Sequence, residues 1–169
     1  MFHGAPILSL RVASRIVDMV YFSSPEPSVG KVAEKIKAQL GSFVWVPWDE
    51  IDSYIEKSDS VLIGPGMKRW HKEIDGEKYQ KPTIDVYDEA GTQTKFITER
   101  LLRKFPNKQW VIDGGALQTM DAKWIPENSV LTPNTKEFEM LFGDVRVSEA
   151  AKKHNCIIIP NTDTNIGMI

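Results

Sequence analysis

Cysteine is almost absent from this chain of 169 residues, in which Cys156 is the only one. One cysteine can form neither an internal disulfide framework nor a cysteine-rich zinc site, which favours a reducing, cytoplasmic location. Long apolar runs are also missing, so no membrane-spanning helix is expected, and the first residues do not resemble a signal peptide. The net charge is only −2 and no basic stripe alternates with aromatic residues, so neither a nucleic acid nor a membrane is expected as a partner.

The residues that are present are typical of a soluble globular protein. Hydrophobic residues make up 41% of the chain and charged residues 26%, and the length suits one domain with a substantial core better than two. The three histidines, His3, His71 and His154, are far apart in the sequence and do not have the spacing of metal ligands. We therefore expect no metal site built by this chain from histidines.

Short β-like runs alternate with helical patterns, which predicts an α/β protein with a mainly parallel sheet. Helices are expected at residues 4–18, 28–40, 49–58, 97–105, 136–142 and 148–155. Strands are expected at residues 17–23, 43–46, 61–64, 110–113, 129–132 and 156–160. Residues 67–94 are charged and contain Gly and Pro, so they are expected to run over the surface.

Three of the expected strands end in unusual polar turns. Their sequences are VLIGPG (61–66), WVIDGGAL (110–117) and SVLTPNTKEFEML (129–141). The carboxyl ends of parallel strands lie at one edge of a sheet, and ligands bind at that edge in open α/β folds. The repetition of strand, polar turn and helix start therefore predicts a shared binding site.

Each turn also has an explanation that needs no ligand. Gly64 and Gly66 can form a tight turn or can let a ligand approach the backbone. The carboxylate of Asp113 can accept a hydrogen bond from a ligand hydroxyl, can hold a water or a metal, or can cap the following helix, which is worth about 1 kcal/mol. Asn134 with Glu137 fits a capping box. The residues taken singly leave these alternatives open.

Taken together, VLIGPGM, WVIDGGALQ and VLTPNTKEFEMLFG resemble successive motifs of the NAD(P)H-hydrate dehydratases, and HGAPILSLRVASR resembles the first helix of that family. The resemblance runs from about residue 2 to residue 159. It implies a ribokinase-like three-layer αβα fold with a mainly parallel central sheet. It also divides the chain into an incomplete dehydratase-like domain at residues 1–159 and an atypical tail at residues 160–169.

The resemblance implies an enzyme that repairs hydrated NADH or NADPH. In that family ADP or ATP, with Mg²⁺, phosphorylates the aberrant hydroxyl of the reduced nicotinamide ring, and phosphate is then eliminated. Carried over position by position, the residues that contact the hydrated dinucleotide are Ala5, Gly64, Gly66, Asp113, Asn134, Thr135, Lys136, Glu137 and Phe138.

The sequence departs from the family pattern in several places. Asn134 and Lys136 stand where many bacterial members have histidine and glycine, and Lys68 stands where a glycine is expected. After residues 156–159 there is neither the lysine–glycine loop that holds the nucleotide nor the G-[TS]-G-D turn that supplies the catalytic aspartate. We therefore expect a fold truncated before its nucleotide-binding end and lacking its phosphoryl-transfer groups.

Two other functions remain open from the sequence. The TPN-x-x-E turn is widespread in ribokinase-like folds, so a kinase of a small alcohol is one alternative. The other is a non-catalytic module that binds the dinucleotide or mediates assembly. Because a truncated sheet exposes an apolar strand edge, we also expect a homo-oligomer in which a partner covers that edge.

Overall fold

The computed structural model describes residues 4–37, 39–70 and 89–161. The chain divides into two compact units, Met1–Asp59 and Ser60–Ile169, which are described separately here. His3, His71, most of the predicted surface excursion (71–88) and the end of the predicted tail (162–169) lie outside the described residues. Among the helices that are described, none combines the length and the apolar character needed to cross a membrane.

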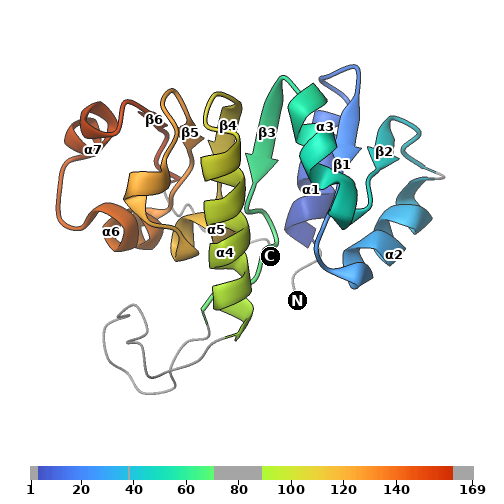
Figure 1. The fold of residues 1–169 in the computed structure, drawn as a ribbon, viewed down its shortest axis with the longest axis horizontal. Helices are drawn as coiled ribbons and strands as arrows, with labels where there is room; N and C mark the ends of the chain where they lie inside the picture. Colours follow the sequence, from blue (N-terminus) through green and yellow to red (C-terminus); the bar gives the residue numbers. More distant parts are fainter. Residues whose placement is uncertain (1–3, 38, 71–88, 162–169) are drawn as a thin grey trace, which may run out of the picture. The chain divides into compact units, whose positions relative to one another are not determined.

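The first unit is a small α/β layer built around two parallel strands (Figure 1). Its elements in chain order are α1 (Gly4–Ala13), β1 (Val20–Phe22), α2 (Pro27–Lys37), β2 (Phe43–Trp45), the 3₁₀ helix η1 (Trp48–Glu50) and α3 (Ile51–Lys57). Leu10 and Ala33 from α1 and α2 pack with Phe43 in its core. The unit thus buries one apolar stripe of each helix, as amphipathic helices do.

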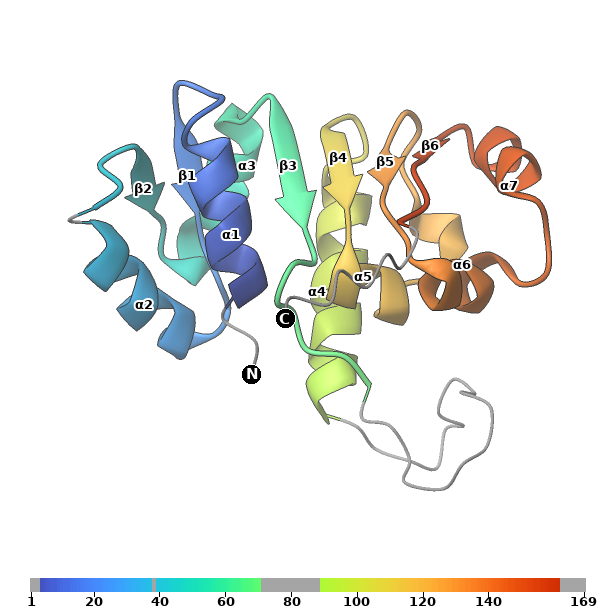
Figure 2. The ribbon, with the colours of Figure 1, turned by 180° about the vertical axis from the view of Figure 1, so that it is seen from behind.

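The second unit contains a sheet of four parallel strands in the order β3-β4-β5-β6 (Figures 1 and 2). Its elements are β3 (Ser60–Ile63), α4 (Glu89–Lys104), β4 (Gln109–Ile112), α5 (Gly114–Thr119), the 3₁₀ helix η2 (Ala122–Trp124), β5 (Val130–Leu131), α6 (Thr135–Phe142), α7 (Val147–Lys153) and β6 (Ile157–Ile158). This confirms the prediction of an α/β protein with parallel strands.

The two faces of the four-stranded sheet differ in burial. Trp110 and Ile112 alternate onto the face covered by α4, where both are fully buried, and the Trp110 indole donates to the carbonyl of Phe105 just beyond α4. On the opposite face, seen in Figure 2, Leu62 is 47% exposed and Ile157 is 56% exposed. Parallel sheets are usually covered on both faces, so the exposure of these two apolar side chains is unusual.

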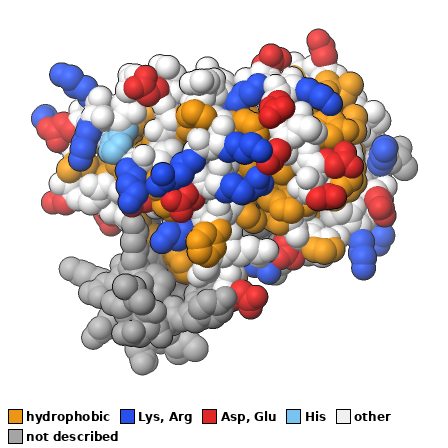
Figure 3. Space-filling model, in the orientation of Figure 1, with side chains coloured by type: hydrophobic (Ala, Val, Ile, Leu, Met, Phe, Trp, Pro, Cys, Tyr) orange, Lys and Arg blue, Asp and Glu red, His pale blue; other side chains and the backbone are white. Residues whose placement is uncertain are grey.

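Figure 3 shows the helix-covered side, where Lys and Arg gather over α4 and α7 with Asp and Glu among them. Arg103 pairs with Glu99 one helical turn away at 3.0 Å, and Arg146 pairs with Glu149. Exposed pairs of this kind contribute little to stability, so the charges mainly keep this surface solvated.

The main error in the predicted elements concerns α4. It begins at Glu89, whereas the sequence was expected to be an irregular surface segment up to residue 94. Gly91, Thr92 and Thr94 have weak intrinsic helix propensity, which conceals the first turns of the helix. Tertiary packing explains their presence, because a Cβ on Gly91 would lie 2.2 Å from the Trp70 ring.

Smaller errors concern element ends. The first helix ends at Ala13 and not at residue 18, and the strands around residues 129–132 and 156–160 are only two residues long. Residues 49–58 divide into a 3₁₀ turn and α3. Gly143 does end α6, with φ +75° and its N–H donating to Glu139, as predicted.

Candidate functional site

The three polar turns meet at the carboxyl edge of the β3–β6 sheet. Residues 64–66 follow β3, Asp113 follows β4, and residues 132–134 follow β5. Because all four strands are parallel, these turns lie at the same edge (Figure 2). The sequence-based prediction that they adjoin is therefore confirmed.

The turns after β3 and β4 interlock through their backbones. Gly64 has φ +112°, and a Cβ on it would lie 1.7 Å from the carbonyl oxygen of Asp113. The Gly115 N–H donates to the Gly64 carbonyl at 3.2 Å, and a Cβ on Gly115 would lie 2.4 Å from the carbonyl oxygen of Met67. Glycine is thus required at positions 64 and 115 by close backbone packing, independently of any ligand.

Asp113 occupies the N-cap position of α5, yet its side chain makes no capping hydrogen bond. Its Oδ1 instead accepts a hydrogen bond of 2.9 Å from the hydroxyl of Thr132 at the end of β5. The helix-capping alternative for Asp113 is therefore wrong. The half-buried carboxylate connects two neighbouring strand ends, and its Oδ2 has no hydrogen-bond partner among the described residues.

The start of α6 is fixed by a complete capping box, as predicted. Asn134 Oδ1 accepts from the Glu137 N–H at 2.9 Å, and Glu137 Oε2 accepts from the Asn134 N–H at 3.0 Å. Glu137 Oε1 accepts a further hydrogen bond of 2.8 Å from the side-chain amide of Gln118 in α5. The Glu137 side chain is buried with both oxygens engaged, whereas Thr135 and Lys136 are exposed.

The segment after β6 joins the same edge. The Asn161 N–H donates to the Pro133 carbonyl at 2.8 Å, and Asn161 forms an isolated parallel bridge with Asn134. The described part of the predicted tail, residues 160–161, therefore extends the pairing begun by β6 and flanks the third turn.

The structure brings together every predicted site residue of the second unit: Gly64, Gly66, Asp113, Asn134, Thr135, Lys136, Glu137 and Phe138. Ala5 lies in α1 of the first unit, where it is exposed. Thr132 and Gln118, which hold Asp113 and Glu137, were not predicted. Thr132 is a polar residue at the end of an apolar strand, and this could have marked it as a site residue. The sequence separation of Gln118 and Glu137 gives no indication that they are in contact.

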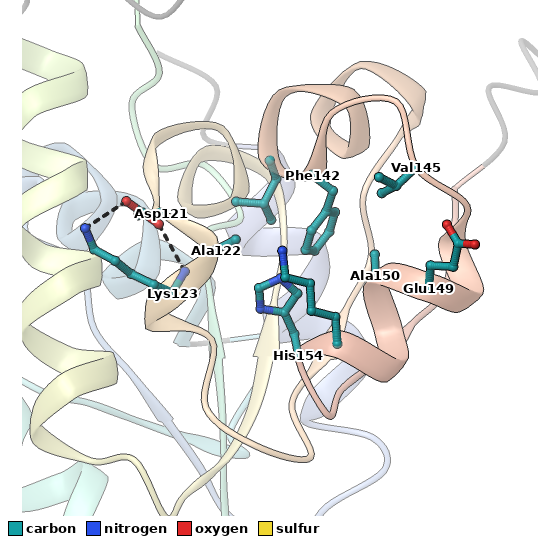
Figure 4. Close-up of a pocket in the computed structure, with 10 residues that line it drawn as sticks. Asp121, Ala122, Lys123, Phe142, Val145, Glu149, Ala150 and His154 are labelled. Atoms are coloured by element: carbon teal, nitrogen blue, oxygen red, sulfur yellow. Dashed lines mark hydrogen bonds and ion pairs between the residues drawn. The ribbon is translucent and has the colours of Figure 1, made fainter.

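A cavity of about 630 Å³ lies elsewhere in this unit, between η2, α6 and α7 (Figure 4). Its wall includes Phe142 and His154, whose ring centroids are 5.4 Å apart, and Asp121, which pairs with Lys123. Burial and the neighbouring Lys153 lower the pKa of His154, so its imidazole is neutral near pH 7. None of the predicted site residues lines this cavity.

Side chains that could surround a metal ion by themselves are not clustered at the carboxyl edge within the described residues. No group of three or more His, Cys, Asp or Glu within the described ranges is arranged to hold one. Cys156 is half-buried, and burial raises the pKa of its thiol, which disfavours the thiolate. The chemistry available at this edge is therefore hydrogen bonding by one accessible carboxylate and by the turns around it.

The sequence of the chain matches a known protein family. The model of the NAD(P)H-hydrate dehydratase family matches residues 1–162. The chain belongs to the NAD(P)H-hydrate dehydratase family. This membership confirms the predicted ribokinase-like α/β fold.

Two relatives of this dehydratase-family chain carry the name bifunctional NAD(P)H-hydrate repair enzyme Nnr. The protein of Methanocaldococcus jannaschii is 29% identical over 150 residues, which cover 83% of this chain and 25% of the relative. The protein of Hyperthermus butylicus is 24% identical over 179 aligned positions, which cover 92% of this chain and 30% of the relative. The chain thus spans less than a third of the length of either relative. No solved structure matches it.

Proposed function

We propose that this chain forms the wall that holds hydrated NADH or NADPH in a nucleotide-dependent coenzyme-repair reaction. The observation that carries the proposal is the state of Asp113. Thr132 fixes one oxygen of its carboxylate, and the other has no partner among the described residues at the carboxyl edge. Such an edge is where open α/β folds bind ligands.

The chemistry of the damaged coenzyme suits this carboxylate. Hydration adds a hydroxyl group to the reduced nicotinamide ring, and intact NADPH has no hydroxyl at that position. A carboxylate oxygen accepts a hydrogen bond from such a hydroxyl, and bonds to ionised acceptors are the stronger kind. A site that hydrogen-bonds a substrate hydroxyl rejects an analogue that lacks it, so Asp113 would favour the hydrated form over the intact coenzyme.

The proposed role stops at binding. Members of the family use ADP or ATP with Mg²⁺, but the 169 residues contain no G-[TS]-G-D sequence, and the described residues contain no group of three or more His, Cys, Asp or Glu placed to hold the metal by themselves. We derive no phosphoryl-transfer step from residues of this chain. Asp113, the glycine turns and the start of α6 would hold and orient the coenzyme.

Calorimetry with hydrated NADPH and with intact NADPH tests this proposal. We expect the chain to bind the hydrated form more tightly. Asp113→Asn should weaken that binding about tenfold because an ionised acceptor is lost, while its amide oxygen can still accept from Thr132.

Asp121→Asn is the matched control for this substitution. Asp121 also occupies an N-cap position, but it accepts from the Lys123 N–H in η2 and lines the separate cavity. Its replacement should leave coenzyme affinity unchanged. Equal affinity for hydrated and intact NADPH, or equal losses in the two variants, would contradict the proposal.

A dehydration assay with ADP or ATP separates binding from catalysis. Binding of hydrated NADPH without turnover is the expected result for these residues alone. Efficient turnover by the 169-residue chain would show that it contains phosphoryl-transfer groups outside the residues assigned here. It would therefore contradict a role confined to binding.

A further inference from the structure

We propose that Gln118 is a positioning residue of the binding edge, which holds Glu137 and thereby fixes Asn134 and the first turn of α6. This inference rests on the proposed function, because it assigns Gln118 a part in orienting the residues that would contact the hydrated coenzyme. The role proposed for Gln118 is to hold other residues in place and not to contact the ligand.

The carboxylate of Glu137 is the centre of the contact. Its residue is only 5% exposed, and each of its oxygens has one hydrogen-bond donor. Oε2 accepts from the backbone N–H of Asn134 at 3.0 Å, and Oε1 accepts from Gln118 Nε2 at 2.8 Å. A buried carboxylate that loses a donor retains its desolvation cost. Each of the two donors therefore helps to fix the position of the Glu137 carboxylate.

The capping box cannot fix the position of α6 by itself. Its two hydrogen bonds join only Asn134 and Glu137, so they hold the first turn together without attaching it to anything else. The Gln118 bond attaches the turn to α5, which packs beside α6, in addition to the backbone bridge between Asn134 and Asn161.

The helix α5 is in turn fixed to the first glycine turn. The Gly115 N–H donates to the Gly64 carbonyl, and Met67 closely faces Gly115. A continuous path of contacts therefore runs from the turn after β3, through α5 and Gln118, to the turn after β5. Thr132 and Asp113 provide a second, parallel side-chain connection between strand ends.

Gln109 offers a matched comparison. It is the same residue type, its Nε2 donates to the Asn128 carbonyl at 2.8 Å, and it begins β4, whereas Gln118 lies in the helix that follows that strand. Both side chains therefore make one hydrogen bond of the same length, Gln109 at the start of β4 and Gln118 in the helix after β4. Only Gln118 connects to the proposed site.

The first experiment measures amide hydrogen exchange in Gln118→Met and Gln109→Met variants. Gln118→Met removes the donor while keeping an unbranched side chain of similar length. We expect exchange of the Asn134 amide to become about tenfold faster in this variant, because its acceptor Glu137 is no longer held. Gln109→Met should leave that amide unchanged. Equal exchange of Asn134 in wild type and Gln118→Met would overturn the proposal.

A Gln118→Glu variant adds a pH readout that simple loss of stability would not produce. When the introduced carboxyl group is protonated it can still donate to Glu137, whereas two ionised carboxylates at this distance repel each other. Asn134 should therefore be protected at low pH and lose protection as the pH rises, with no such change in wild type. A pH-independent result for this variant would also contradict the proposal.

Affinity for hydrated NADPH completes the test. Gln118→Met should weaken binding about tenfold and Gln109→Met should not. Unchanged affinity in Gln118→Met, whatever its thermal midpoint, would overturn the positioning role. If the wild-type chain fails to bind hydrated NADPH, the proposed function fails, and the exchange experiments still decide by themselves whether Gln118 holds Asn134.

Discussion

Both edges of the β3–β6 sheet contain residues with a positive φ angle, but the residue types differ. At the carboxyl edge, Gly64 has φ +112° and its neighbour Asp113 leaves no space for a Cβ. At the amino edge, the positive φ angles belong to Asn128 (61°) and Asn155 (47°), whose backbones hydrogen-bond to each other at 2.7 Å. Asparagine tolerates this conformation and keeps its side chain. The carboxyl edge therefore has no space for a side chain at Gly64, whereas the positive-φ residues of the amino edge carry side chains.

The polar side chains of the two edges also differ in the groups to which they donate hydrogen bonds. At the amino edge, Gln109 and Ser129 donate to backbone carbonyls and not to side chains. At the carboxyl edge, side chains join one turn to the next, through Thr132 to Asp113 and through Gln118 to Glu137. The carboxylates of Asp113 and Glu137 are therefore held by side chains from neighbouring elements, which is the kind of support that a binding site needs.

Gly64→Ala should have the largest effect. A methyl group at this position would meet a backbone carbonyl at 1.7 Å in a conformation that L-residues rarely adopt, so the two turns must separate. We expect a loss of about 3 kcal/mol or more in the free energy of unfolding, measured by urea denaturation.

Asn128→Ala is the control for this prediction at the amino edge. Alanine would again occupy a position with a positive φ (61°), so the free energy of unfolding should fall by only about 1 kcal/mol. Equal losses in the two variants would show that the carboxyl edge is not the more tightly packed of the two.

Glu137→Gln should have an intermediate effect. Its amide oxygen can still accept from Gln118, but its amide nitrogen cannot accept from the Asn134 N–H, so a buried donor loses its partner. We expect destabilisation of about 1–3 kcal/mol by thermal or urea unfolding.

Glu149→Gln provides the contrast, since Glu149 pairs with Arg146 at the surface and the side chains are 52% and 79% exposed. That change should cost less than about 0.5 kcal/mol. If Glu149→Gln destabilised the protein as much as Glu137→Gln, the carboxylate at the carboxyl edge would have no special structural role.

His154, which follows α7 near the amino edge, should have the smallest effect, and it depends on pH. Burial and then Lys153 lower its pKa in the folded state below the ordinary value of 6.5. The unfolded chain therefore binds the proton first as the pH falls, so stability should decline as the pH drops through about 6.5 and level off below the folded-state pKa. His154→Gln should lack this part of the slope in urea midpoints measured from about pH 7.5 to about pH 5. An identical slope in both proteins would contradict the assignment.

Much of the site could be predicted because its signals are local. The alternation of strands and helices predicted the parallel sheet, and parallel strands necessarily bring their carboxyl ends to one edge. The Asn134 and Glu137 spacing predicted a capping box that the structure contains. The start of α4 could not be predicted, because packing of Trp70 against Gly91 overrides weak helix propensity.

The sequence by itself determined the class of fold, the parallel order of the strand ends and the capping of α6, since each depends on periodicity or on residues a few positions apart. Only the tertiary structure decided what Asp113, Gly64 and Glu137 do. The partners of these residues, Thr132 and Gln118 among them, lie on other elements of the chain. Asp113 was equally compatible with a helix cap until the fold placed the Thr132 hydroxyl 2.9 Å from its carboxylate. Contacts between distant residues follow from packing, and no local pattern specifies them.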